Sequence, residues 1–234
     1  DPGVAAPSTL TTSLSSWNPL FHGRVHHTSI LSLTRVTSPL SHIPSHQDAL
    51  HNLGLSPDSL ERLYATLTTL GIPITHPDAP HLRTTQRIAT LSVLRGEFSP
   101  ETIVTLTANL GRETGNGDAI TTTSMPSYGG ASHATSAFLT ANMSRYWGAG
   151  ILSNISANVN VFQRSSQPYL LLPEGRVRIQ SAMAEGDTVP VWIQFGGNPT
   201  LSSDSRTTTA AMRLALSRFS IDSKHRYTIG GGIR

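Results

Sequence analysis

Apolar residues recur at helical spacing in several segments of the first 150 residues. The clearest is 56–70, which begins with the capping sequence Ser56-Pro57-Asp58 and is followed by Gly71 and Pro73, residues that commonly end a helix. Its apolar positions lie three or four residues apart, at Leu60, Leu63, Tyr64, Leu67 and Leu70. Residues at this spacing share one face of an α-helix. The pattern predicts a helix over 56–70.

Weaker helical patterns surround this segment. A short helix is expected between Ser45, which forms a capping box with Asp48, and Gly54. Further helices are expected over 84–95, 99–111 and 131–147. Gly96 and Gly111 follow two of them at positions where glycine often ends a helix. These helices together predict a compact helical subdomain.

Two stretches lack this periodicity. Residues 1–45 are rich in Ser, Thr, Pro and His, which favours an extended arm, with short strands conceivable around 27–36. Residues 112–130 are rich in Gly, Thr, Ser and Asn, with little apolar content. We expect this second stretch to form a mobile surface loop.

The period changes after Gly150. Alternating or continuous apolar residues predict strands near Val159 and Val161 and over 170–172, 176–182 and 189–195, with turns at 173–175 and 185–187. A last helix is expected over 206–219, then a strand over 226–229 and a flexible segment at 230–232.

The expected fold class is therefore α+β, with a mainly helical N-terminal and central part followed by a small antiparallel sheet and a C-terminal helix. Three units are expected along the chain. They are an arm (1–45), a helical subdomain with a loop at 112–130 (46–150), and a β-rich part with a C-terminal helix and a flexible tail (151–234).

The amino-acid composition favours a protein that contacts phosphates or partner subunits. The chain has no cysteine, Lys224 is its one lysine among 17 basic residues, and about a quarter of its positions are Ser or Thr, roughly double ordinary usage. Charged residues make up 13%, half the usual share. Arginine suits contacts with phosphates or partner subunits, although codon bias would produce the same excess. A neutral, hydroxyl-rich surface is suited to packing against copies of itself.

Basic residues concentrate in the last third of the chain. They form a candidate surface for contact with nucleic acid or a neighbouring subunit, and a merely solvated face is the alternative. The candidate residues are Arg164, Arg176, Arg178, Arg206, Arg213, Arg218, Lys224 and Arg226.

No catalytic motif is present, so we expect no enzymatic activity. A serine nucleophile on a G-x-S-x-G elbow is absent, and the glycines of 111–117 lack the Lys-Ser/Thr ending of a phosphate-binding loop. His42 and His46 have a spacing that could hold a metal, but Pro44 lies between them and no HExxH motif exists. We therefore expect no catalytic residue, metal or cofactor.

Apolar runs such as 169–172 are far shorter than the roughly 20 residues of a membrane span, and no charged-then-apolar signal segment opens the chain. We expect a soluble protein that is not exported and that does not contact a membrane. Because the chain begins with Asp1-Pro2 rather than Met, processing of a longer product is one interpretation.

The whole-chain composition resembles that of viral structural proteins, especially coat or nucleocapsid subunits. The segment 217–222 is also similar to the Arg and Asp near the RNA groove of flexuous-filament coat proteins, whereas the expected helices disfavour a jelly roll. The resemblance implies self-assembly with copies of the chain or with other capsid subunits. It leaves open whether the chain contacts viral RNA or only protein. It also implies a location in the virion and, during assembly, in the host cytoplasm. The alternatives are an accessory module that binds through Trp17, Phe21, Trp147 and Trp192, and an unrecognised hydrolase.

Overall fold

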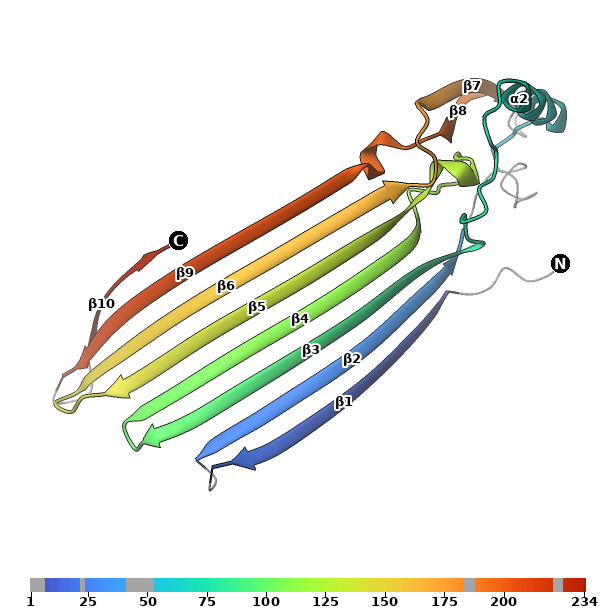
Figure 1. The fold of residues 1–234 in the computed structure, drawn as a ribbon. Helices are drawn as coiled ribbons and strands as arrows, with labels where there is room; N and C mark the ends of the chain where they lie inside the picture. The colour runs from blue at the N-terminus through green and yellow to red at the C-terminus, as the bar shows by residue number, and fades with distance from the viewer. Residues whose placement is uncertain (1–6, 22–23, 41–52, 183–187, 221–224) are drawn as a thin grey trace.

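The computed structural model describes residues 7–21, 24–40, 53–182, 188–220 and 225–234. These residues form one long antiparallel sheet with a small cap at one end (Figure 1). The sheet has eight strands, in the order β1-β2-β3-β4-β5-β6-β9-β10. They are β1 (Ser8–Leu20), β2 (Val25–Pro39), β3 (Leu82–Ser99), β4 (Thr102–Asp118), β5 (Gly130–Tyr146), β6 (Ile151–Pro168), β9 (Ser203–Phe219) and β10 (Arg226–Ile233).

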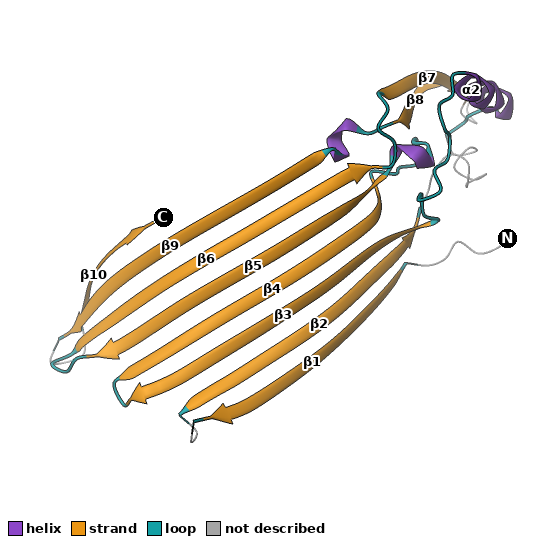
Figure 2. Ribbon diagram, viewed as in Figure 1, coloured by secondary structure: helices purple, strands orange, loops and turns teal. Residues whose placement is uncertain are grey.

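The cap is built from the connections that leave one end of this sheet. It contains the helix α2 (Pro57–Thr69), the hairpin of β7 (Glu174–Ala182) and β8 (Thr188–Gly196), and two 3-10 turns, Pro126–Tyr128 and Pro199–Leu201. Every helical segment among the described residues lies at this end (Figure 2). At the opposite end, short turns join β3 to β4 and β5 to β6. The chain is thus a meander with insertions after β2, β4 and β6.

The buried core lies in the cap, not in the sheet. Leu55, Leu60, Leu67, Met125 and Ile193 form one cluster of buried side chains. Backbone hydrogen bonds tie the parts of the cap together, including Met125 N–H to the Gln194 carbonyl at 2.9 Å and Ser127 N–H to the Ile74 carbonyl at 3.3 Å. The eight-stranded sheet has no second layer among the described residues.

The expected α+β class, mainly helical before residue 150, is wrong, because the segments 84–95, 99–111, 131–147 and 206–219 form strands β3, β4, β5 and β9. Their residues pair in continuous antiparallel register with neighbouring strands. Threonine is β-branched and favours strands, and sheet pairing overrides the helix propensity of alanine. Gly111 does not end a helix; it lies inside β4 between Ala89 and Ser136.

Other expectations have mixed outcomes. The helix over 56–70 is confirmed as α2, with the Ser56 hydroxyl accepting from the Ser59 N–H. The strands near 27–36, over 176–182 and 189–195, and at 226–229 are confirmed, but 170–172 forms no strand. The short helix and the turn at 185–187 fall largely or wholly outside the described residues.

Several expectations about loops and ends are corrected. The expected loop at 112–130 begins in β4 and then carries Ile120, Met125 and Tyr128, all buried. Residues 230–232 lie in β10, and most of the expected N-terminal arm forms the hairpin of β1 and β2. The divisions at 45 and 150 do not separate structural units, because strands from all three segments pair in one sheet.

Candidate nucleic-acid and subunit interfaces

The two faces of the eight-stranded sheet differ in chemistry. Successive residues of a strand point to opposite faces, and directly opposed residues of antiparallel strands share a face. The pairing of Leu110 with Ala137, and of Leu139 with Val159 and Ala108, therefore defines one face. Asn109, Phe138 and Asn160 lie opposite one another on the other face.

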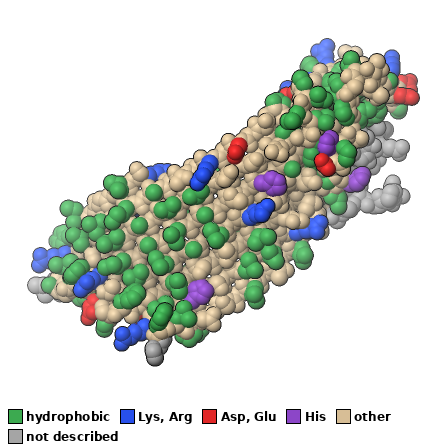
Figure 3. Space-filling view, viewed as in Figure 1, with side chains coloured by type: hydrophobic (Ala, Val, Ile, Leu, Met, Phe, Trp, Pro, Cys, Tyr) green, Lys and Arg blue, Asp and Glu red, His purple; other side chains and the backbone are tan. Residues whose placement is uncertain are grey.

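The first face, here called the leucine face, carries a broad apolar band. Large side chains on it are 40–70% exposed, so nothing in the described chain covers them. The band includes Leu14, Leu31, Leu33, Ile88, Leu106, Leu110, Leu139, Val159, Met212 and Leu214. Figure 3 shows this face, with apolar side chains gathered over the half of the sheet away from the cap.

The half of the leucine face nearer the cap is polar. One row across the strands contains Arg35, Thr114, His133, Ser165 and Asp204, as the strand registers show. Charged and histidine side chains accordingly appear toward the cap in Figure 3. The apolar band therefore ends at a polar boundary, which is the anatomy of a protein interface with an apolar centre and a polar rim.

An apolar cleft of about 490 Å³ lies at the turn end of the sheet. Phe21, Val25, Leu94 and Phe98 contribute to its walls, and Arg24 and Glu97 are its charged residues. Phe21 and Phe98 are 77% and 66% exposed. The cleft has the size and lining that would receive an apolar side chain from a neighbouring molecule.

The second face, here called the hydroxyl face, is dominated by hydroxyl and amide side chains. It includes Ser13, Ser15, Thr28, Ser32, Thr105, Thr107, Asn109, Ser136, Asn142, Ser156, Asn158, Asn160, Thr207 and Thr209. These groups can donate and accept hydrogen bonds but carry no charge. Large apolar side chains such as Phe138 and Phe162 are interspersed among them.

Six arginines lie on the hydroxyl face. Arg83 donates to the backbone carbonyls of Gly117 and Ile120. The other five are Arg87, Arg95, Arg164, Arg213 and Arg226. Three acids, Glu97, Glu113 and Asp118, share this face, and Arg95 lies 3.9 Å from Glu97. Arg226 is held in place, because its guanidinium donates to the Ser217 hydroxyl at 3.0 Å and lies over the Phe219 ring. The face therefore carries a net positive charge spread across the strands.

An aromatic pair stands on the same face near one edge. The rings of Trp17 and His26 stack with centroids 5.4 Å apart and an interplanar angle of 15°. Trp17 is 61% exposed, so its outer ring surface is open. Exposed aromatic rings beside arginines are the elements with which proteins stack the bases of single-stranded nucleic acid.

The structure places seven of the eight expected contact residues, in three parts of the molecule. Arg164, Arg213 and Arg226 share the hydroxyl face, whereas Arg206 and Arg218 lie on the leucine face. Arg176 and Arg178 belong to β7 of the cap, where Arg176 donates to Glu174 at 2.6 Å. Lys224 lies outside the described residues.

Sequence reasoning missed Arg87 and Arg95, which share the hydroxyl face with three of the expected residues, and named Trp17 only as a contact of an accessory module. The available signal was the even spacing of Arg87 and Arg95, eight residues apart, which a strand interpretation would have assigned to one face.

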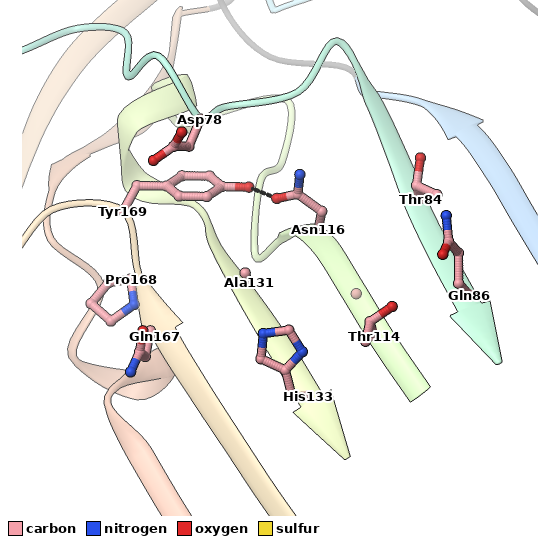
Figure 4. A pocket seen from close by; sticks show the side chains of 11 residues that line it. Asp78, Thr84, Gln86, Thr114, Asn116, Ala131, His133, Gln167, Pro168 and Tyr169 are labelled. Carbon is pink, nitrogen blue, oxygen red and sulfur yellow. Dashed lines mark hydrogen bonds between the residues drawn. The ribbon is translucent and has the colours of Figure 1, made fainter. Parts of the chain in front are cut away.

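A polar cavity of about 510 Å³ lies where the cap meets the leucine face (Figure 4). Tyr169 is held in place at the edge of this cavity. The Tyr169 hydroxyl donates to Asn116 Oδ1 and accepts from the Gly117 N–H at 3.0 Å, and the Tyr169 ring stacks on His76. Burial raises the pKa of the Tyr169 phenol. Other walls come from the side chains of Asp78, Thr84, Gln86, Thr114, His133 and Gln167.

This cavity offers amide, hydroxyl and imidazole groups that can hydrogen-bond to a polar ligand. No serine is among the described residues that line it, so it does not assemble a Ser-His-Asp triad. Within the described ranges, no three His, Asp or Glu side chains gather as metal ligands. His42, His46 and Asp48 fall outside those ranges.

In the part of the chain that the structure describes, no helix has the length and apolarity to cross a bilayer. The chain matches no protein-family model, and neither the curated proteins nor the solved structures include one significantly similar to it.

Proposed function

We propose that this chain is a structural subunit of a viral capsid or nucleocapsid-like assembly. In this proposal the leucine face packs against copies of the chain or other capsid subunits, and the hydroxyl face contacts the RNA genome. The protein would then reside in the virion and, during assembly, in the host cytoplasm. The observation that carries the proposal is a single-layer sheet whose two open faces differ in chemistry.

The exposed area supports self-association. The chain exposes 15360 Å², whereas a compact monomer of 25.1 kDa exposes roughly 10,300 Å². The excess of about 5,000 Å² is several times the area of roughly 800 Å² that each partner buries in a standard interface. The ten large apolar side chains named on the leucine face are 40–70% exposed, so covering them would contribute strongly to association.

Charge supports contact with a polyanion. The strands of the eight-stranded sheet contain eleven arginines and four acidic residues, although the whole chain has a formal charge of only +3. Six of these arginines and three of the acids lie on the hydroxyl face. The arginines are Arg35, Arg83, Arg87, Arg95, Arg112, Arg145, Arg164, Arg206, Arg213, Arg218 and Arg226; the acids are Glu97, Glu113, Asp118 and Asp204. Non-specific RNA contact needs such distributed charge, hydroxyl and amide donors, and stacking rings, rather than one deep site.

Two neighbouring residues of β4 allow the roles of the faces to be separated. Leu110 on the leucine face is 53% exposed, and Asn109 beside it is an exposed residue of the hydroxyl face. L110E places a carboxylate inside the apolar band, so we expect it to dissociate oligomers in sedimentation equilibrium. N109E should leave the oligomer intact and weaken RNA binding.

Circular dichroism would verify that both variants keep the strand content of the native chain. The proposal is contradicted if L110E and N109E have the same effect on oligomerisation, or if the native chain remains a monomer at high concentration.

A second candidate function is supported by four exposed aromatic residues. Trp17, Phe21, Trp147 and Trp192 are 61%, 77%, 57% and 54% exposed. They lie in different parts of the molecule, which suits an accessory module that decorates a larger assembly through several contacts. A tight one-to-one complex with another capsid subunit, formed by a monomer that does not self-associate, would favour this function.

A further inference from the structure

Strand β1 is an edge of the sheet with an open side. Within the described residues it pairs with β2 and with no other strand, and all thirteen of its residues are exposed (Figure 1). Its outer edge therefore presents backbone N–H and C=O groups that can pair with another strand.

This edge lacks the features that usually prevent pairing. Natural edge strands carry charged residues, proline or bulges, or are very short. β1 has thirteen residues with no charge, and its register with β2 runs without a shift from Ser8–Thr37 to Leu20–Val25. Its one proline, Pro19, is the penultimate residue of the strand.

The opposite edge of the sheet is better protected. β10 has eight residues, begins with Arg226 and contains three consecutive glycines, which weaken a strand. It pairs only with Met212–Phe219 of β9, so the outer side of 203–211 is also open. That stretch, however, contains Asp204 and Arg206. The long uncharged edge is therefore specific to β1.

We propose that β1 pairs antiparallel with β1 of a second copy of this chain, joining two eight-stranded sheets into one continuous sheet. A two-fold axis perpendicular to the sheet generates this pairing, and such an isologous contact closes after two subunits. The leucine faces and the hydroxyl faces of the two copies then become continuous. The proposal rests on the self-association in the proposed function, and it identifies a contact distinct from packing of the leucine faces.

Full overlap of the thirteen residues fixes the register. Leu14 is the middle residue, so it lies on the axis opposite its own equivalent, while Ser13 lies opposite Ser15 of the second copy. Opposed serines already form a hydrogen bond between β1 and β2, where the hydroxyls of Ser16 and Ser29 lie 2.8 Å apart. Because β1 carries no charge, pairing with itself brings no like charges together.

A single cysteine at position 14 tests the register directly, because the native chain contains no cysteine. Directly opposed residues of antiparallel strands have Cα atoms about 4.5–5.5 Å apart, within the range that a disulfide spans. We expect L14C to form a covalent dimer under mild oxidation at least ten times faster than T12C. Position 12 of the two copies would be separated by four residues of strand, about 13 Å.

A charge exchange on the hydroxyl face provides an independent test. S13K/S15K would place lysines opposite lysines across the axis, so we expect the cross-linking of L14C to be lost in this background. S13K/S15E would place each new lysine opposite a new glutamate, so we expect cross-linking to be retained. Equal cross-linking in the two backgrounds, or equal rates for L14C and T12C, would overturn the proposal.

The experiments can contradict the pairing of β1 with β1 and the packing of the leucine faces separately. If L14C does not cross-link while the native chain forms an oligomer that L110E dissociates, the edge proposal is wrong and the proposed function stands. If L14C cross-links in the L110E background, the edge pairing is confirmed as independent of the leucine face.

Discussion

Removing two arginines from the hydroxyl face should weaken RNA binding in a salt-dependent way. The variant is R164Q/R213Q, which removes two charges from β6 and β9 and keeps side chains of similar length and polarity. Each arginine that neutralises a phosphate releases a counterion, and for single strands each such contact contributes about −0.7 to the slope of log K against log salt.

The expected size follows from the five arginines of this face other than Arg83, whose guanidinium donates to the Gly117 and Ile120 carbonyls. Five contacts give a slope of at most about −3.5, which corresponds to about a 130-fold loss of affinity between 50 and 200 mM salt. Three contacts give about −2.1 and about an 18-fold loss. Fluorescence anisotropy of a labelled single-stranded RNA at four salt concentrations would measure both slopes.

The matched control is R206Q/R218Q. It removes two arginines from the leucine face of β9, the strand that also carries Arg213. We expect this control to retain the native slope. Equal reductions of the slope in the two double variants, or none in R164Q/R213Q, would refute the assignment of RNA contact to the hydroxyl face.

Three further predictions concern the cap. I193A removes a fully buried side chain, so we expect a loss of about 2–5 kcal/mol in hydrogen-exchange protection of α2 and β8, with the sheet centre less affected. S56A removes the hydroxyl cap of α2 and should cost about 1 kcal/mol in the same measurement. The Arg176 guanidinium lowers the pKa of the Glu174 carboxyl below its ordinary value of 4.5. This ion pair therefore stabilises the cap above pH 4.5 and loses its effect as the pH falls through the lowered pKa. E174Q should remove this pH dependence from acid titrations of the cap followed by Trp192 fluorescence.

Some elements were predictable because their signals are local. Ser56, Pro57 and Gly71 mark the ends of α2 in the sequence itself, and the alternation of Arg176, Arg178 and Gln180 with apolar residues marks β7. The exposure of Trp17, Phe21, Trp147 and Trp192, which the accessory-module interpretation needs, agrees with the structure.

The long strands were not predictable from the same signals. In an ordinary sheet with one buried face, apolar and polar residues alternate, but this sheet is a single layer, and both of its faces carry apolar residues. In β3, Ile88 lies on one face and Leu91 on the other, so their spacing of three resembled a helical stripe. Ala-rich β5 likewise has helix propensity that its pairing with β4 and β6 overrides.

The candidate site was predictable only in part. A cluster of arginines late in the chain is visible in the sequence, but a helix over 206–219 would place Arg206 and Arg213 on similar faces. In β9 they lie on opposite faces, because seven residues is an odd number of steps along a strand. Arg87 and Arg95, which also lie on the hydroxyl face, come from β3, more than a hundred residues before Arg213.

Light scattering and negative-stain imaging of the purified chain, titrated with single-stranded RNA at low and high salt, test the central claim most directly. The account predicts ordered particles or filaments, with RNA-dependent assembly that weakens steeply as salt rises. A monomer that stays monomeric at high concentration and is indifferent to RNA at both salt concentrations would contradict it.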